Sequence, residues 1–422
     1  MAAHLIGEGV VPGPGLELIG QEEIDQVVDV LRSGHVARYG DDNDPTFLAK
    51  VQQLEREISA RSSVRHAVAV NSGTSALWLI MASLGIGPGD EVIVPGFTFI
   101  ASISAVVHVR ARPVLAEIDE SLNLDPQDVE SRITPRTRAI LAVHMLGNPA
   151  RLAELHAIAQ RHGLWLIEDC AQAFGASYRG RPVGSIGVAG ALSFNIFKTI
   201  TCGDGGMLIT DDGDLYERAF ALHDQGHLPL RKGVEMGRRA LLGLNFRMTE
   251  LSGAVLLAQL RKLDRIRDHL RAQKALFKSR LAELPGVRFR DLPDTEGDLA
   301  TFLTLFFPSE EIARRVATKL ETRVAADSGW HIYNHMEHLL GLRMATDKGC
   351  PFNCPSYFSE PPDYRAGMLP RTDAITARTL NIGIGVDDPN LGAAFGVTMH
   401  DGPEEVEERA ARFIEVAGPL LR

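Results

Sequence analysis

The sequence predicts an α/β fold: a large domain with a mostly parallel central sheet between helices, followed by a smaller C-terminal α+β domain. Over the first two-thirds of the chain, short β-rich runs alternate with amphipathic segments, which is typical of parallel strands joined by crossover helices. Residues 251–281 contain few helix breakers and carry an apolar repeat, so we expect one long helix leading out of the large domain. A chain of 422 residues exceeds one ordinary core, and we place the domains at residues 1–265 and 266–422.

The individual elements follow from composition and turn residues. Residues 76–82 are expected to form a helix after the first strand, and residues 87–90 are a turn. Beyond the long helix, residues 310–320 and 404–421 have helical composition, whereas the proline-rich residues 344–369 are expected to form an irregular loop. The predicted strands of the large domain are residues 68–70, 91–94, 112–116, 139–143, 164–167, 190–194 and 206–210.

Composition and charge disfavour several classes of protein. The net charge of −10 disfavours binding to nucleic acid or to an anionic membrane. No apolar stretch approaches the roughly 18 residues of a membrane span, and residues 1–8 do not resemble a secretory signal. Four cysteines are too few for a disulfide framework, and the isolated pair Cys350 and Cys354 does not favour a zinc site. We therefore expect a cytoplasmic protein with reduced cysteines and without a metal.

Lys198 is the first candidate functional residue. It follows Ser193 by five residues and precedes the glycine-rich residues 203–206, which is a poor setting for a solvated surface lysine. Burial near a cationic ring lowers the pKa of an amine and makes it a better nucleophile. We interpret Lys198 as the residue that forms a Schiff base with pyridoxal 5′-phosphate.

Asp169 and Gln172 are the expected partners of the cofactor ring. Asp169 follows the apolar run 164–167, so its carboxylate should lie at the carboxyl edge of the sheet, where ligands of open α/β sheets bind. There it could keep the pyridine nitrogen protonated, although a helix N-cap is the alternative interpretation. Gln172 can reach the 3′-oxygen if the chain turns back over the cofactor. Glu168 would point to the opposite face of the strand and is left out of the site.

Three further residues are candidates for holding the phosphate, and one for stacking on the ring. Gly73 and Thr74 lie between a strand and a helix, where free backbone amides and the helix dipole favour an anion, although small residues open many helices merely by capping. Ser193 is a second phosphate contact. Phe99 is a candidate to stack on the pyridine ring, with plain core packing as the alternative.

Over about residues 20–270, these blocks resemble those of the DegT/StrS family of sugar aminotransferases, which are fold-type I pyridoxal phosphate enzymes. The stretches that carry the resemblance are residues 71–77, 87–95, 168–173, 193–206 and 243–248. The resemblance implies the cofactor roles given above for Lys198, Asp169, Gln172, Gly73, Thr74 and Ser193.

The resemblance also implies a role for Asn245, which the residues alone would mark only as part of a turn. In the family this asparagine reaches the phosphate from the neighbouring subunit, which implies a homodimer with shared active sites. Members that act as sugar dehydratases carry a histidine in place of the lysine, so Lys198 favours transamination. The candidate site comprises Lys198 and Asp169 as catalytic residues, with cofactor contacts from Gly73, Thr74, Phe99, Asp169, Gln172, Ser193, Lys198 and Asn245.

A narrower resemblance concerns the sugar. Residues 198–203, 243–247, 258–264 and 293–298 are similar to the branch that installs the amine of 8-amino-3,8-dideoxyoctulosonate in lipopolysaccharide. Past about residue 323 the likeness fades, in a region expected to supply part of the substrate pocket. The sugar therefore stays open.

The expected reaction is ping-pong transfer of an amino group, from L-glutamate, to a keto- or aldehydo-sugar such as a nucleotide sugar, a sugar acid or a related cyclitol. The alternatives are a dehydratase, a carbocycle-forming synthase on the same scaffold, and a non-catalytic regulatory protein that binds the cofactor. The complete set of lysine, aspartate, glutamine and asparagine disfavours the last. Candidates for gripping acidic or phosphorylated substrate groups are Arg38, Arg238, Arg239, Arg247, His223, His227, Trp330 and His331.

Overall fold

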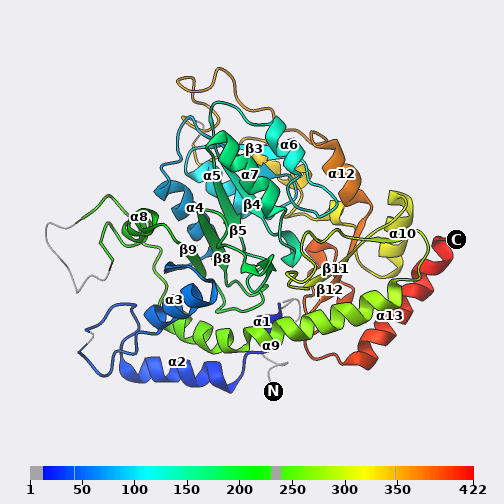
Figure 1. Ribbon diagram of the computed structural model, residues 1–422, viewed down its shortest axis with the longest axis horizontal. Coiled ribbons are helices and arrows are strands. Elements are labelled where there is room, and N and C mark those ends of the chain that lie inside the picture. Colours follow the sequence, from blue (N-terminus) through cyan, green and yellow to red (C-terminus); the bar gives the residue numbers. More distant parts are fainter. Residues whose placement is uncertain (1–12, 42, 230–238, 347) are drawn as a thin grey trace.

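The computed structural model describes residues 13–41, 43–229, 239–346 and 348–422. Its seven-stranded sheet has the order β1-β9-β8-β5-β4-β2-β3 (Figure 1). Strand β9 runs antiparallel to both of its neighbours, β1 and β8, and all other neighbouring strands of this sheet are parallel. The strands are β1 (His66–Val70), β2 (Glu91–Pro95), β3 (Arg112–Ala116), β4 (Thr137–Val143), β5 (Trp165–Asp169), β8 (Ala189–Ser193) and β9 (Gly206–Thr210).

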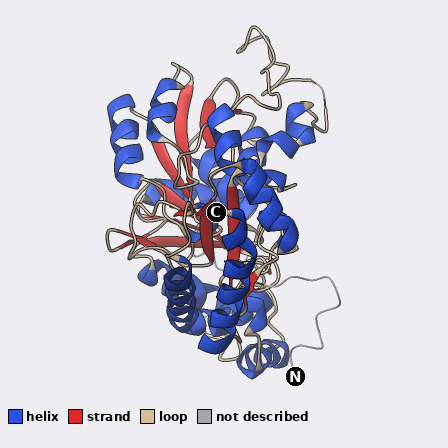
Figure 2. Ribbon diagram, turned by 90° about the vertical axis from the view of Figure 1, so that its right-hand side faces the viewer, coloured by secondary structure: helices blue, strands red, loops and turns tan. Residues whose placement is uncertain are grey.

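Helices cover both faces of this sheet, as the perpendicular view shows (Figure 2). Because side chains alternate along a strand, Leu141 and Val143 of β4 pack into one core cluster and Ile140 and Ala142 into another. The first face carries α4 (Gly73–Ser83), α5 (Ile100–His108) and α8 (Gly213–His223). The opposite face carries α3 (Lys50–Arg61), α6 (Pro126–Ser131), α7 (Leu152–His162) and the start of α9 (Glu250–Leu281).

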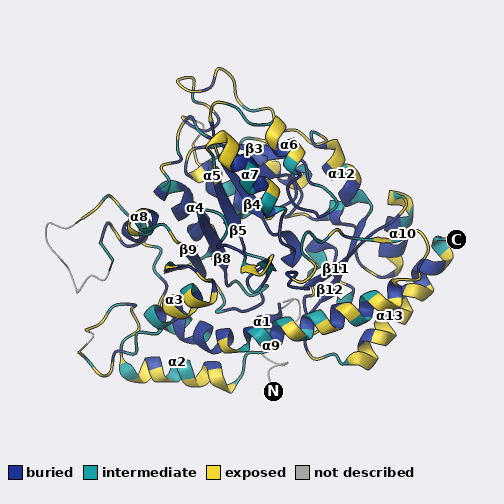
Figure 3. Cartoon of the chain, in the orientation of Figure 1, coloured by how far each residue is buried: buried dark blue, intermediate teal, exposed yellow. Residues whose placement is uncertain are grey.

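The long helix α9 connects the large sheet to the C-terminal part of the chain. Thr249 caps its first turn by accepting a hydrogen bond from the backbone of Ser252. The helix contacts α2 (Gln21–Ser33) and α3, and also α13 (Pro403–Ala417), as Figure 1 shows along its lower edge. Outward faces of α2 and α13 are exposed, while the central strands of the large sheet are mostly buried (Figure 3).

The C-terminal part contains a four-stranded sheet of order β10-β11-β12-β13. Its first three strands pair antiparallel and the last pair is parallel. Its elements are β10 (Arg288–Phe289), β11 (Phe302–Phe306), β12 (Thr379–Ile384), β13 (Gly396–Val397), α10 (Glu310–Lys319), α11 (Glu337–Leu340), α12 (Pro370–Ala377), η3 (Ala325–Asp327), η4 (Tyr333–His335), η5 (Pro389–Leu391) and η6 (Gly418–Leu420). The remaining short elements are α1 (Pro14–Glu17), β6 (Ser177–Tyr178), β7 (Arg181–Pro182) and η2 (Met145–Gly147).

The predicted α/β class is confirmed, with a large, mostly parallel sheet and a smaller C-terminal unit. Each predicted strand and each of the predicted helices at residues 76–82, 251–281, 310–320 and 404–421 has a counterpart in the structure. The reversed direction of β9 follows from its connection: the loop that carries Lys198 returns the chain beside β8. Among the described residues, no helix has the length and apolarity that crossing a membrane requires.

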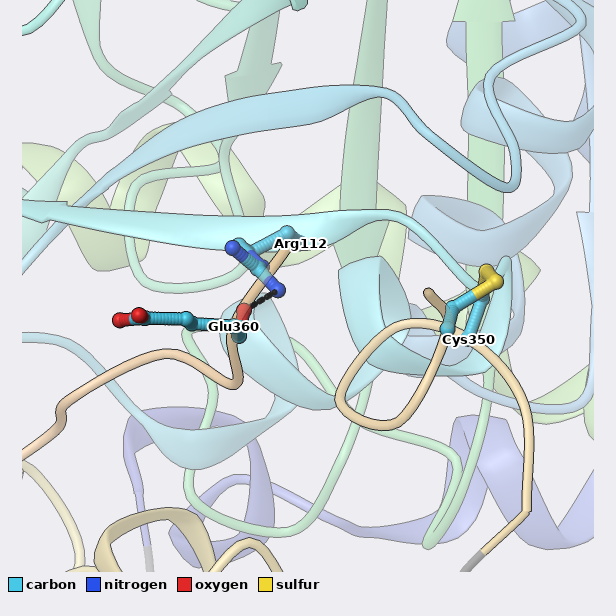
Figure 4. The surroundings of a disulfide bond; sticks show 4 residues. Arg112, Cys350 and Glu360 are labelled. Atoms are coloured by element: carbon cyan, nitrogen blue, oxygen red, sulfur yellow. Dashed lines mark hydrogen bonds between the residues drawn. A yellow bond between two sulfur atoms is a disulfide. The ribbon is translucent and has the colours of Figure 1, made fainter. Parts of the chain in front are cut away.

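The described part of residues 344–369 is irregular, as predicted, but its cysteines are not reduced. Cys350 and Cys354 form a disulfide (Figure 4), so the expectation of reduced cysteines is wrong for this pair. A tight turn, in which Asn353 N donates to Gly349 O at 3.0 Å, brings the two Cα atoms to 4.7 Å, within the range that a disulfide spans. Sequence spacing alone does not reveal this turn.

Glu168 fixes the carboxyl end of β5 from the face opposite to Asp169. Its carboxylate is fully buried and contacts His144 Nε2 at 3.0 Å. It also accepts hydrogen bonds from the backbone amides of Gly184, Ile186 and Gly187 at 2.8, 2.7 and 2.6 Å. Burial opposes ionisation, but these donors and His144 hold the pKa of Glu168 below its ordinary value. The strand end that bears Asp169 is thereby tied to the following loop.

Replacing Glu168 by Ala should therefore destabilise the protein strongly. The change leaves buried amides and a buried imidazole without their acceptor, and we expect a loss of about 3 kcal/mol or more in the free energy of unfolding. Urea denaturation measures the loss. The matched control Glu57→Ala, at an exposed position of α3, should change stability by about 0.5 kcal/mol or less. Equal losses in both variants would contradict this account of β5.

Candidate active site

A cavity of about 330 Å³ lies where β4, β5 and β8 end. Val143, Asp169 and Ser193 are the last residues of these three strands, and all three line the cavity. Ligands of open α/β sheets bind at this carboxyl edge. The predicted site residues found in the cavity wall are Gly73, Thr74, Phe99, Asp169, Gln172, Ser193 and Lys198.

The carboxylate of Asp169 is held at both oxygens. Oδ2 accepts a hydrogen bond from Ser102 Oγ at 2.8 Å, and Oδ1 accepts one from Ala171 N at 3.1 Å. Ser102 Oγ in turn lies 2.7 Å from Thr98 Oγ1. Burial raises the pKa of Asp169, although its hydrogen bonds and the charge of Lys198 oppose the rise. A buried carboxylate of this kind favours a cationic partner in the cavity.

Lys198 lies on the loop between β8 and β9, and residues 13–15 pack against this loop. Lys198 N donates a hydrogen bond to Asn195 O at 3.0 Å. Gly13 N donates to Ile196 O at 3.0 Å, and Gly15 N donates to Lys198 O at 3.3 Å. The backbone that carries the lysine is therefore held on both sides of the residue.

Burial and the neighbouring charges shift the pKa of the Lys198 amine in opposite directions. Burial lowers its pKa, whereas the carboxylates of Asp169 and Asp388 oppose the change. A lowered pKa leaves a larger share of the amine neutral at a given pH, which is the form that attacks a carbonyl group. The chemistry expected of Lys198 from the sequence is thus compatible with its surroundings.

The first turn of α4 presents its backbone amides to the cavity. Ser72 caps the helix by accepting a hydrogen bond from Ser75 N at 3.1 Å. The amides of Gly73 and Thr74, which precede it, make no hydrogen bond within the described parts of the chain. A Cβ atom at Gly73 would lie 2.8 Å from the Cβ of Ser193, so glycine allows the serine to approach this turn. Free amides at a helix N-terminus favour a phosphate.

Gln172 and Phe99 also face the cavity. Gln172 Oε1 accepts a hydrogen bond from Leu146 N at 2.8 Å, which leaves its Nε2 to donate to a ligand. Phe99 is 37% exposed, so it is not an ordinary core residue. Its ring lies 5.5 Å from that of His331 and 6.3 Å from that of Trp330. These rings make an aromatic wall.

Of the candidates for contacting substrate groups, two line the cavity and two others are buried elsewhere. Trp330 and His331 line the cavity. Arg38 and His223 do not, because they are buried in a cluster of their own: Arg38 Nη2 donates to both oxygens of Glu55, at 2.9 and 3.0 Å, and Arg38 Nη1 lies 3.0 Å from His223 Nε2. The charge of Arg38 is thus paired with Glu55 away from this chain's cavity, while burial and the charge of Arg38 lower the pKa of His223 to about 3.

Asn245 lies outside the cavity of its own chain. It is exposed and forms a β-bridge with Asp224, and its Oδ1 accepts a hydrogen bond from Arg247 N at 3.3 Å. Arg247 Nη1 donates to Asp224 Oδ1 at 2.5 Å. Of the other candidates, His227 and Arg239 form a bridge with each other, and Arg238 lies outside the described residues.

Sequence reasoning missed Ser102, Ser72 and Asp388. The contact between Ser102 and Asp169 spans 67 residues of sequence, and no local pattern announces it. Ser72 carried a usable signal, since a serine before Gly-Thr at the start of a helix is a common N-cap. Asp388 reaches the cavity from the C-terminal part of the chain, beyond the motifs that carry the resemblance.

These residues fit pyridoxal phosphate. Free amides and a serine hydroxyl suit its phosphate, a buried carboxylate suits its pyridine nitrogen, and an amine of lowered pKa suits its aldehyde. The glycine at position 73, where a side chain would collide with Ser193, keeps the anion site open.

The chain is similar in sequence and in structure to several known proteins. The chain is 37% identical over 377 residues to the dTDP-3-amino-3,4,6-trideoxy-alpha-D-glucose transaminase of Streptomyces venezuelae, covering 89% of this chain and 91% of that protein. It is 38% identical over 279 residues to the spore coat polysaccharide biosynthesis protein SpsC of Bacillus subtilis, covering 64% of this chain and 69% of the relative. Among solved structures, 3-amino-5-hydroxybenzoic acid synthase superimposes with a TM-score of 0.76 at 28% identity, covering 95% of this chain and 97% of that one.

The family resemblance inferred from the motifs is confirmed by a match that extends well beyond them, into the C-terminal part of the chain. The chain belongs to the DegT/DnrJ/EryC1/StrS aminotransferase family, whose sequence model matches residues 17–387.

Proposed function

We propose that the cavity carries pyridoxal phosphate on Lys198 and transfers an amino group from L-glutamate to a keto- or aldehydo-sugar. Enzymes of this family depend on pyridoxal phosphate, so the class of reaction follows from membership. One observation carries the assignment of residues: the amine of Lys198 and the carboxylate of Asp169 face one cavity, whose wall also offers the free amides of α4.

Different residues of the cavity would bind different groups of the cofactor. The amides of Gly73 and Thr74 and the hydroxyl of Ser193 would bind the phosphate, because a helix N-terminus favours an anion. Asp169 would hold a proton on the pyridine nitrogen, and Gln172 Nε2 would donate a hydrogen bond to the 3′-oxygen. The ring of Phe99 would lie against the cofactor.

When bound, pyridoxal phosphate draws electrons from the Cα atom of the amino donor and so acidifies the Cα–H bond. Lys198 Nζ would accept that proton, and its lowered pKa leaves more of the neutral amine that can do so. Lys198 Nζ would move a proton in the reverse direction when the acceptor takes the place of the donor. The buried carboxylate of Asp169 would keep the pyridine nitrogen protonated throughout both half-reactions.

The sugar is the open part of the proposal. The relative from S. venezuelae is named for a dTDP-sugar, which supports a nucleotide-sugar acceptor. The narrower resemblance to the 8-amino-3,8-dideoxyoctulosonate branch stays a prediction, as do the cytoplasmic location and the domain boundary at residues 265 and 266. A carbocycle-forming synthase is the second candidate, since a synthase of an aromatic amino acid shares the fold along almost the whole chain. The presence of Lys198 disfavours the dehydratase.

We further propose a homodimer in which Asn245 completes the cofactor site of the partner. Asn245 is exposed and lies outside its own cavity, which suits a residue that acts across an interface. Leu242 and Leu244 beside it are 99% and 52% exposed, as expected of apolar residues that a second subunit covers.

Replacement of Lys198 by Ala should abolish covalent attachment of the cofactor and turnover. Borohydride reduction of the loaded protein, followed by intact-mass measurement, should add one phosphopyridoxyl group to the wild type and none to the variant. Lys319→Ala, at an exposed position of α10, is the matched control and should label like the wild type. Labelling and wild-type turnover in Lys198→Ala would refute the assignment.

Mixing two inactive variants tests whether Asn245 acts in the partner's site. Lys198→Ala and Asn245→Asp, the latter placing an anion against the phosphate, should each be inactive as homodimers. If Asn245 acts across the interface, the mixed dimer contains one intact site, and full exchange should restore about a quarter of wild-type activity. Lack of recovery after exchange, verified by native mass spectrometry, would place Asn245 outside the partner's site.

A panel of acceptors tests the substrate class. The loaded enzyme is incubated with L-glutamate and, separately, a dTDP-keto-sugar, a GDP-keto-sugar and an eight-carbon aldehydo-sugar acid, and 2-oxoglutarate is quantified. We expect catalytic amounts of 2-oxoglutarate with one sugar and a single equivalent per site without acceptor. Turnover with a cyclic keto-acid, together with no turnover with any of the sugars, would favour the synthase.

A further inference from the structure

A second carboxylate, that of Asp388, lines the cavity together with Lys198, and the cofactor contacts described above leave it without a role. It comes from the turn that precedes η5, which lies between β12 and β13 in the C-terminal part of the chain. The same turn brings Asn390 to the cavity wall, so the cavity is closed by residues from both parts of the chain.

The turn holds Asp388 firmly and leaves its carboxylate without a side-chain donor among the described residues. Oδ1 accepts a hydrogen bond from Asn390 N at 2.9 Å. Asp388 N donates to Ala393 O at 3.2 Å, and Ala393 N donates to Asp388 O at 3.0 Å. The backbone amides of Asn390 and Leu391 both act on the carboxylate, and no side-chain donor of the described residues makes a hydrogen bond to it. Since an ionised carboxylate accepts hydrogen bonds at both oxygens, Asp388 keeps capacity for a partner in the cavity.

Lys198 lines the same cavity as this carboxylate and is the one lysine or arginine among the side chains that form its wall. The electrostatic interactions that act on its amine come from Asp169 and Asp388. Two other titratable side chains line the cavity. Burial and the charge of Lys198 lower the pKa of His331 to about 3, so its ring is neutral near neutral pH, and Asp204 accepts a hydrogen bond from a side-chain amide.

The two carboxylates that act on Lys198 have different neighbours. Asp169 is held by Ser102 and by Ala171 N on the large sheet, where the proposed function assigns it to the pyridine nitrogen. That assignment would engage Asp169 with a positive charge of the cofactor. Asp388 then remains as the carboxylate available to balance a positive charge on the nitrogen of Lys198.

We propose that Asp388 is the counter-charge of Lys198, which holds the proton on Lys198 Nζ and sets the pH at which that nitrogen loses it. The inference rests on the proposed function, because it concerns a Lys198 that carries the cofactor. Asp388 acts through Lys198 and is therefore a positioning residue. It also couples the C-terminal part of the chain to the reacting nitrogen.

The direction of the effect follows from charge. An ionised Asp388 favours the protonated form of the nitrogen and so raises its pKa. Burial raises the pKa of Asp388 itself, while its hydrogen bonds and the charge of Lys198 oppose the rise. The influence of Asp388 is therefore present above the pKa of its carboxyl group and disappears as the pH falls through that value. Removing the charge should lower the pH at which the cofactor-bearing nitrogen deprotonates.

The test is a pH titration of the absorbance of the bound cofactor in the loaded enzyme, without substrate. Asp388→Asn and Asp388→Ser remove the charge, and both residue types can still cap the turn by accepting from Asn390 N. Their midpoints should fall by on the order of one pH unit, whereas Asp388→Glu, which keeps the charge, should titrate close to the wild type. Asp387→Asn is the matched control, since it removes a neighbouring exposed carboxylate that does not line the cavity.

The outcomes separate this inference from the proposed function. A midpoint that stays at the wild-type value in both neutral variants at position 388 would overturn the inference alone. An equal shift in Asp387→Asn would also overturn it, by showing a general effect of net charge. A wild-type protein that shows no covalently bound cofactor after addition of pyridoxal phosphate would overturn the proposed function first.

Discussion

Two opposite charges in one partly closed cavity, the amine of Lys198 and the carboxylate of Asp169, organise the rest of the structure. Burial penalises each charge alone, and each reduces the penalty of the other. Keeping them in place requires rigid supports. Asp169 is the last residue of a buried parallel strand, and the backbone around Lys198 is held by hydrogen bonds from Gly13 and Gly15. Glu168 ties the same strand to the next loop from the opposite face.

The supports of the cavity come from distant parts of the chain. The sheet contributes the strand ends, α4 contributes an anion site at its first turn, and the C-terminal part contributes Trp330, His331 and Asp388. This division suits a transaminase, which must hold one cofactor and admit two unlike substrates in turn. The residues proposed to bind the cofactor lie at the end of the large sheet, on the loops that follow its strands and on α4. The C-terminal wall, where the narrower resemblance fades, has room to differ with the acceptor.

The fold and much of the cavity could be predicted because they depend on patterns within short stretches of the sequence. Alternation of strands and helices indicated the parallel sheet, and the end of an apolar run located Asp169 at its edge. Contacts between distant segments were beyond such reasoning. Ser102 reaches Asp169 across 67 residues, and Asp388 enters the wall of the cavity that holds Lys198 from the C-terminal part of the chain. The disulfide between Cys350 and Cys354 depends on a turn that their spacing does not encode. Arg38 looked like a substrate contact by charge alone, yet its charge is satisfied by Glu55.

The most direct test of the central claim is the absorbance spectrum of the loaded protein before and after addition of L-glutamate, without acceptor. The account predicts a band of lysine-bound pyridoxal phosphate that gives way to the band of pyridoxamine phosphate, with one equivalent of 2-oxoglutarate released per site. A bound-cofactor band that does not respond to glutamate would contradict the assigned donor. A protein that acquires no such band even with added pyridoxal phosphate would contradict the account as a whole.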